Sequence, residues 1–166
     1  MRTLLVPFLL VLVLPATAFA NQPNPGPAGS GTLSIREGRG MVQLNARGSI
    51  TGRLRGRITI TDPTPYDSKR PVVYGATKTT YKNDRKVIYQ GKNVRFRLIG
   101  ALYTIRLEGR AIFMSAIGHG KGQLDGDGDV QADIFYDGVW SLNDEPYHSL
   151  PDEPTKFDLI TPPTPG

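Results

Sequence analysis

Residues 46–56 read Ala46-Arg-Gly-Ser-Ile-Thr-Gly-Arg-Leu-Arg-Gly56, and residues 116–126 read Ala116-Ile-Gly-His-Gly-Lys-Gly-Gln-Leu-Asp-Gly126. The two segments share one Ala, three Gly and one Leu at a constant offset of 70 residues, from 46 to 116. Side chains of a strand point alternately to its two faces, so we expect the shared Gly and Leu to face a crowded interior. The repeat predicts an internal hairpin duplication, with hairpins near residues 39–61 and 110–136.

The second copy of the repeat inverts the charge of the first. The first copy carries Arg53, Arg55 and Arg57, whereas the second carries Gln123, Asp125 and Asp127, followed by Asp129. Residues 31–58 hold six arginines against one glutamate, and residues 121–145 hold one lysine against seven carboxylates. Two interpretations follow: a basic surface for an anionic partner, or opposite charges that face each other across paired strands. The second is the simpler one, because residues that duplicate one another often pair in space.

Residues 1–20 have the form of a secretory signal peptide, with an apolar run over 4–14 and an Ala-x-Ala site that ends at Ala20. The apolar run is shorter than the ~20 residues that a spanning helix needs, and Pro7 and Pro15 interrupt it. We therefore expect cleavage after Ala20, the alternative being a retained anchor. The mature chain is expected to be secreted or held at the cell envelope of a bacterium, without a membrane span.

The mature chain is expected to hold one domain. Residues 21–31 form a Pro/Gly-rich flexible linker, residues 32–160 the β-domain, and residues 161–166 a disordered Pro-rich tail. The chain contains 0 cysteines, which excludes disulfides, thiolate metal sites and a cysteine nucleophile. Any catalysis must come from Ser, His, Tyr or carboxylate side chains.

Polar and apolar residues alternate through nearly the whole domain, with no helical period over a long window. Strands are expected near residues 32–37, 39–48, 50–61, 72–81, 86–90, 92–99, 101–108, 110–118, 120–126, 129–136, 139–142 and 157–160. The fold class is all-β: a single small barrel of about ten short antiparallel strands, with a two-sheet sandwich as the alternative. A barrel is favoured because closure removes exposed strand edges.

Three motifs carry a resemblance to known proteins: Val94-Arg-Phe-Arg-Leu-Ile-Gly100, Gly118-His-Gly120 and Trp140-Ser-Leu-Asn143. With them the chain resembles a group of small exported bacterial all-β proteins to which no activity is assigned. The motifs look like turns and core strands, so the resemblance implies the fold and transfers no catalytic residue.

Five arginines are candidate anion-binding residues: Arg53, Arg55, Arg57, Arg95 and Arg97. They form two outward ladders, and guanidinium forks match phosphate and carboxylate. The expected partner is an anionic envelope polymer, a lipid headgroup or another envelope protein. Nucleic acid is not expected, because Tyr66, Tyr74, Tyr81, Tyr89 and Phe96 are not grouped in the sequence as a stacking platform.

Asp125, Asp127 and Asp129 stand at alternate positions and are weak candidates for calcium binding. A calcium loop of this pattern requires glycine at its sixth position and an acid at its twelfth, where this chain has Val130 and Tyr136.

His119 lies between two glycines and beside the acidic run, so a hydrolase could combine it with these carboxylates and a serine such as Ser115 or Ser149. No assembled catalytic motif is present in the sequence. We therefore expect a non-enzymatic exported domain with a structural or binding role, no cofactor and no catalytic residue. A hydrolase and a calcium-dependent binding module are the alternatives.

Overall fold

The computed structural model describes residues 29–127 and 137–160, and within these ranges every regular element is a strand. This confirms the expected all-β class. The strands are β1 (Gly31–Thr61), β2 (Val72–Tyr74), β3 (Lys78–Asn83), β4 (Lys86–Gly126), β5 (Val139–Leu142), β6 (His148–Ser149) and β7 (Thr155–Leu159). The leader, most of the linker, the expected strand 129–136, Asp129 and the tail lie outside the described residues.

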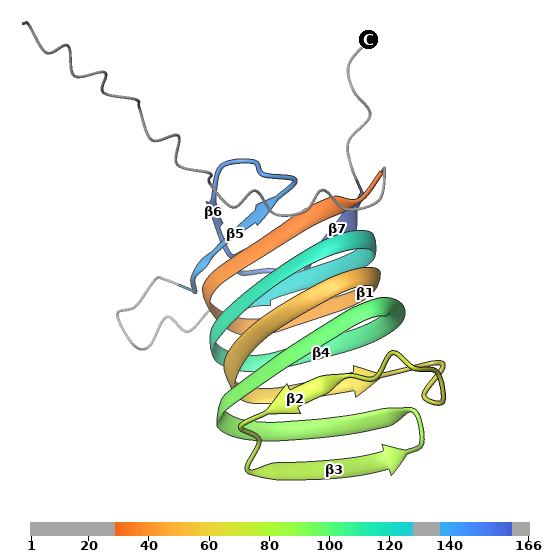
Figure 1. The fold of residues 1–166 in the computed structure, drawn as a ribbon. Helices are drawn as coiled ribbons and strands as arrows, with labels where there is room; N and C mark the ends of the chain where they lie inside the picture. The colour runs from red at the N-terminus through yellow and green to blue at the C-terminus, as the bar shows by residue number, and fades with distance from the viewer. Residues whose placement is uncertain (1–28, 128–136, 161–166) are drawn as a thin grey trace, which may run out of the picture.

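Two very long strands dominate the architecture. β1 has 31 residues and β4 has 41, and they pair antiparallel along most of their length. Many residues of β1 have two partners in β4: Asn45, for example, lies opposite both Thr104 and Lys121. The two strands therefore wind together as a flattened coil, in which turns of β1 alternate with turns of β4 (Figure 1).

The coil has two walls that face each other. The register joins segments 31–36, 112–118, 48–54 and 94–99 into the first wall, which continues into β5 and β6 at one end and into β2 at the other. It joins segments 119–126, 40–47, 102–109, 56–61 and 86–91 into the second wall, which continues into β7 and β3. Both long strands pass repeatedly from one wall to the other.

Glycines mark the places where the strands change walls. They recur every eight or nine residues, at Gly40, Gly48 and Gly56 in β1 and at Gly91, Gly100, Gly109 and Gly118 in β4, and Gly31 and Gly126 continue this spacing at the strand ends. Gly48 lies directly opposite Gly118. A Cβ on Gly48 would lie 2.8 Å from the Cα of Gly118, and a Cβ on Gly118 would lie 2.9 Å from the Cα of Gly48. Only glycine permits this close approach of two backbones at a bend.

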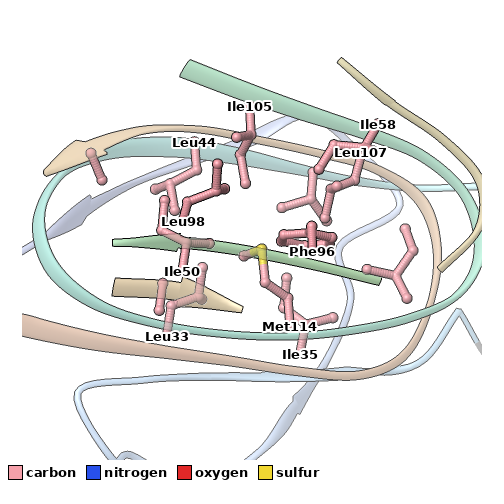
Figure 2. Close-up of a cluster of buried hydrophobic side chains, with 14 of the residues drawn as sticks. Leu33, Ile35, Leu44, Ile50, Ile58, Phe96, Leu98, Ile105, Leu107 and Met114 are labelled. Carbon is pink, nitrogen blue, oxygen red and sulfur yellow. The ribbon is translucent and has the colours of Figure 1, made fainter. Parts of the chain in front are cut away.

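The hydrophobic core lies between the two walls. Figure 2 shows Leu44 and Ile105 of the second wall pointing toward Leu33 and Ile50 of the first. All four side chains are almost completely buried, with at most 1% of their surface exposed. Burial of each such side chain contributes about 1.5–3 kcal/mol, so the alternating apolar positions of β1 and β4 hold the walls together.

The expected barrel is wrong, because the sheet does not close. The strands run around the coil instead of along it, so a single seven-stranded antiparallel sheet ends in edge strands. The two-sheet alternative is also wrong, because both walls are hydrogen-bonded parts of this one sheet. The lysines Lys78 and Lys82 on β3 are typical of a protected edge.

The expected hairpin at 39–61 is wrong as well, since β1 runs through this region without a reversal. Of the expected hairpin at 110–136, β4 covers the part up to Gly126 without a reversal, and residues 128–136 lie outside the described residues. About ten strands were expected, but several of them are consecutive segments of the two long strands. Leu54 and Leu124, which correspond in the repeat, are both buried, with 2% and 0% of their surface exposed. The duplication itself stays a prediction.

Candidate functional site

Arg53 and Arg95 lie directly opposite each other on the outer face of the first wall. Both side chains are exposed, because their neighbours Leu54 and Val94 point into the core. The guanidinium carbon of Arg53 lies 4.3 Å from the centre of the Phe113 ring, which fixes this side chain over the sheet. No carboxylate pairs with either arginine within the described ranges.

A second like-charged pair lies where the chain bends toward the second wall. Arg55 is directly opposite Arg110. A hollow of ≈ 370 Å³ beside this pair is lined by Arg53, Arg55 and Lys92 and by no carboxylate. The sequence did not single out Arg110 or Lys92, because their proximity to Arg55 and Arg53 depends on the pairing of segments far apart in the chain.

We name Arg53, Arg55, Arg95, Arg110 and Lys92 the arginine belt. Three neighbouring hollows connect its members. Arg53 lines both the hollow of ≈ 370 Å³ and one of ≈ 550 Å³ that also holds Arg95. Arg55 lines both the hollow of ≈ 370 Å³ and one of ≈ 840 Å³ that also holds Arg110. The belt therefore continues from the outer face of the first wall around the bend.

Arg57 does not belong to the belt, because it forms an ion pair with Glu108. Its Nη2 lies 2.6 Å from Oε2 of Glu108, and Arg106 Nε lies 3.1 Å from Oε1 of the same carboxylate. Burial acts to raise the pKa of Glu108, but the hydrogen bonds and charges of the two arginines outweigh it and hold this pKa below its usual value. Arg97 lies two residues beyond Arg95 on the same face, opposite Thr51 and Val72.

Within residues 29–127 and 137–160, the arginine and aspartate ladders do not pair across neighbouring strands. The register places Asp125 opposite Met41 and Arg57 opposite Glu108. Arg55 and Asp125 nevertheless line the same open hollow of ≈ 840 Å³, together with Arg39, Arg110, Glu108, Asp127 and Asp152. No ion pair joins an arginine of this hollow to Asp125, Asp127 or Asp152 within the part of the chain that the structure describes.

The structure does not bring His119 to Asp125. His119 and Asp125 are six residues apart on the extended strand β4, which separates them by about 20 Å. The Nε2 atom of His119 lies 3.2 Å from the Ser30 hydroxyl oxygen. Ser115 lies on the first wall, and Ser149 lies on β6. The expected alternative of a triad from these residues is therefore not assembled.

The expected calcium ligands are only partly described. Asp125 is the second-last residue of β4, and Asp127 follows the last residue, Gly126. Asp129 lies outside the described residues. Among residues 29–127 and 137–160 no group of three or more His or carboxylate side chains is placed to hold a metal ion.

Within the same ranges, no helix is long and apolar enough to cross a bilayer. Comparison of the chain with protein-family models, with curated proteins and with solved structures finds no match.

Proposed function

We propose that this protein is a non-enzymatic exported domain that binds an anionic ligand through the arginine belt. The observation that carries the proposal is the direct juxtaposition of Arg53 with Arg95 and of Arg55 with Arg110. Like charges directly opposite each other destabilise a sheet, and a phosphate or carboxylate group bound between them would remove that cost. The hollow of ≈ 370 Å³ offers such a group three cations and no competing carboxylate.

An extended polymer suits the belt better than a small anion. The hollows of ≈ 370 Å³ and ≈ 550 Å³ share Arg53 and are lined by no carboxylate, so one ligand with repeated charges can contact both in turn. Neighbouring cations that each release counterions give a polymer a strong, salt-dependent affinity. The leader predicted in residues 1–20 supports an anionic polymer of the cell envelope as the ligand.

The proposal is tested by calorimetric titration with two probes, long-chain inorganic polyphosphate and polygalacturonate, over a range of salt concentrations. The variant R95Q/R110Q removes one arginine from each like-charged pair. The matched control K86Q/K121Q removes the same charge at two exposed positions of β4 outside the belt. Replacing Lys121 removes a contact of 3.9 Å between its Nζ and Oδ1 of Asp158.

We expect R95Q/R110Q to weaken binding by at least about tenfold, since hydrogen bonds to charged groups contribute about 1.5–3 kcal/mol each. K86Q/K121Q should bind almost as the wild type does. The comparison of the two probes distinguishes phosphate from carboxylate polymers. Equal weakening by both variants would mean a diffuse charge effect and would contradict a built site.

A second candidate, hydrolysis, is favoured by one observation only. Asp125, Asp127 and Asp152 line the same open hollow as Arg55 and Arg110. Carboxylates beside arginines can serve as acid and base in the cleavage of a bound polymer. Release of reducing ends from polygalacturonate by the wild type, lost in D125N/D127N, would favour this candidate over simple binding.

A further inference from the structure

The inner face of the second wall continues beyond the packed core. In the register, Ile60 lies opposite Val87, and Val87 lies opposite Tyr81 of the edge strand β3, so the three side chains share the inner face. Ile60 is 2% exposed, whereas Tyr81 is 75% exposed. β3 therefore presents an aromatic ring on a face that is filled by core side chains elsewhere.

Residues 62–71, which connect β1 to β2, form the other side of this space. Tyr66 and Pro65 of this loop line a hollow of ≈ 410 Å³ together with Tyr81 and Tyr89. The Tyr66 hydroxyl donates a hydrogen bond of 3.0 Å to Oδ2 of Asp84 at the turn between β3 and β4. This bond and the charge of Asp84 raise the pKa of Tyr66. Three tyrosines that are far apart in the sequence therefore line one hollow.

We name the hollow of ≈ 410 Å³ lined by Tyr66, Tyr81 and Tyr89 the tyrosine hollow. The charges of its polar side chains balance. Asp62 and Asp84 are hydrogen-bond acceptors only, and Arg70 and Arg85 are donors only. Asp62 is 6% exposed and its Oδ1 accepts the backbone N–H of Thr64 at 2.9 Å, so this carboxylate is held in place. An anion would offer no hydrogen-bond donor to the two carboxylates, and a cation would offer no acceptor to the two guanidinium groups. A neutral ligand with several hydroxyl groups, each both donor and acceptor, matches all four.

We propose that the tyrosine hollow binds a neutral saccharide. One face of a pyranose ring packs against the exposed ring of Tyr81 or Tyr66, and its hydroxyl groups bond to the aspartates and arginines. The volume lies in the range of about 300–1,000 Å³ that is usual for small-molecule sites. The tyrosine hollow shares no residue with the arginine belt, so saccharide binding here does not depend on whether the belt binds an anion.

The test is calorimetric titration of the full chain with four neutral probes: cellotetraose, maltotetraose, mannotetraose and N-acetylchitotetraose. The variant Y81A removes an exposed ring at the end of the sheet. The matched control Y74A removes a ring of similar exposure, 68%, from β2, where it does not line the hollow. Y66F keeps the ring and removes only the hydrogen bond to Asp84.

We expect at least one of the four probes to bind and Y81A to weaken it by about tenfold, the usual value of one aromatic contact. Y74A should leave the affinity unchanged, and Y66F should weaken it less than Y81A does. Absence of binding by all four probes at millimolar concentration would overturn the proposal. Equal affinity of the wild type and Y81A for a saccharide that binds would overturn it as well.

Discussion

Replacing Arg95 and Arg110 by glutamine should stabilise the unliganded protein while it removes the anion site. Replacing Arg95 removes its repulsion from Arg53, and replacing Arg110 removes its repulsion from Arg55. Two unit charges about 6 Å apart in water repel by about 0.7 kcal/mol. With the screening length of about 30 Å at about 10 mM salt, the two pairs together amount to about 1 kcal/mol.

Salt should erase this gain in stability. At about 0.5 M salt the screening length falls below the separation of the charges, and only a few tenths of a kcal/mol remain. In thermal unfolding, a gain of about 1 kcal/mol corresponds to a rise in Tm of about 3–5 °C for a domain of this size.

Urea unfolding is the assay of choice, because urea is uncharged and leaves the ionic strength unchanged. R95Q/R110Q should unfold at a higher urea concentration than the wild type at low salt and at nearly the same concentration at high salt. The control K86Q/K121Q should show no such salt-dependent gain. If R95Q/R110Q is as stable as the wild type or less stable at low salt, the pairs do not repel in the folded protein and the reasoning is refuted.

Three further predictions concern the fold. G48A should lower the free energy of unfolding by about 2–4 kcal/mol in urea, because the new Cβ would collide with the backbone at Gly118; an effect below about 0.5 kcal/mol would speak against the bend. The pKa of Glu108 is held low in the folded state, so its ion pair with Arg57 stabilises the protein above the usual Glu pKa and is lost as the pH falls through the folded value. Unfolding of E108Q and wild type across pH should show a difference that is largest near neutral pH and disappears in acid, whereas a difference independent of pH would count against the ion pair. Burial and nearby carboxylates raise the pKa of Tyr103 to about 12, so stability should fall as the pH rises from about 10 through 12, and Y103F, followed by the same melts, should lack this loss.

Much of the fold could be predicted from alternation and glycine spacing. The expected boundary between strands 39–48 and 50–61 lies next to Gly48, and the boundary between 110–118 and 120–126 lies next to Gly118, where the chain does change walls. The error was to expect the chain to reverse within residues 39–61, where β1 instead bends and continues. A local sequence has the same pattern at a turn and at a bend, and only the partner strand decides between them.

The candidate site could be predicted only residue by residue. Alternation alone places Arg53 and Arg95 on an outer face, but their juxtaposition depends on the register between segments about 40 residues apart in the chain. The same is true of Arg110 opposite Arg55. Arg57 looked equivalent to its neighbours in the sequence, yet the register places it opposite Glu108, with which it forms an ion pair.

The claim that anions bind at the arginine belt is tested most directly by NMR mapping. Amide signals of the ¹⁵N-labelled full chain are recorded during titration with polyphosphate. We predict that the largest shifts occur at Arg53, Arg55, Arg95 and Arg110 and that R95Q/R110Q abolishes them. Shifts spread evenly over the lysines and arginines of both walls, or concentrated away from these four residues, would contradict the account.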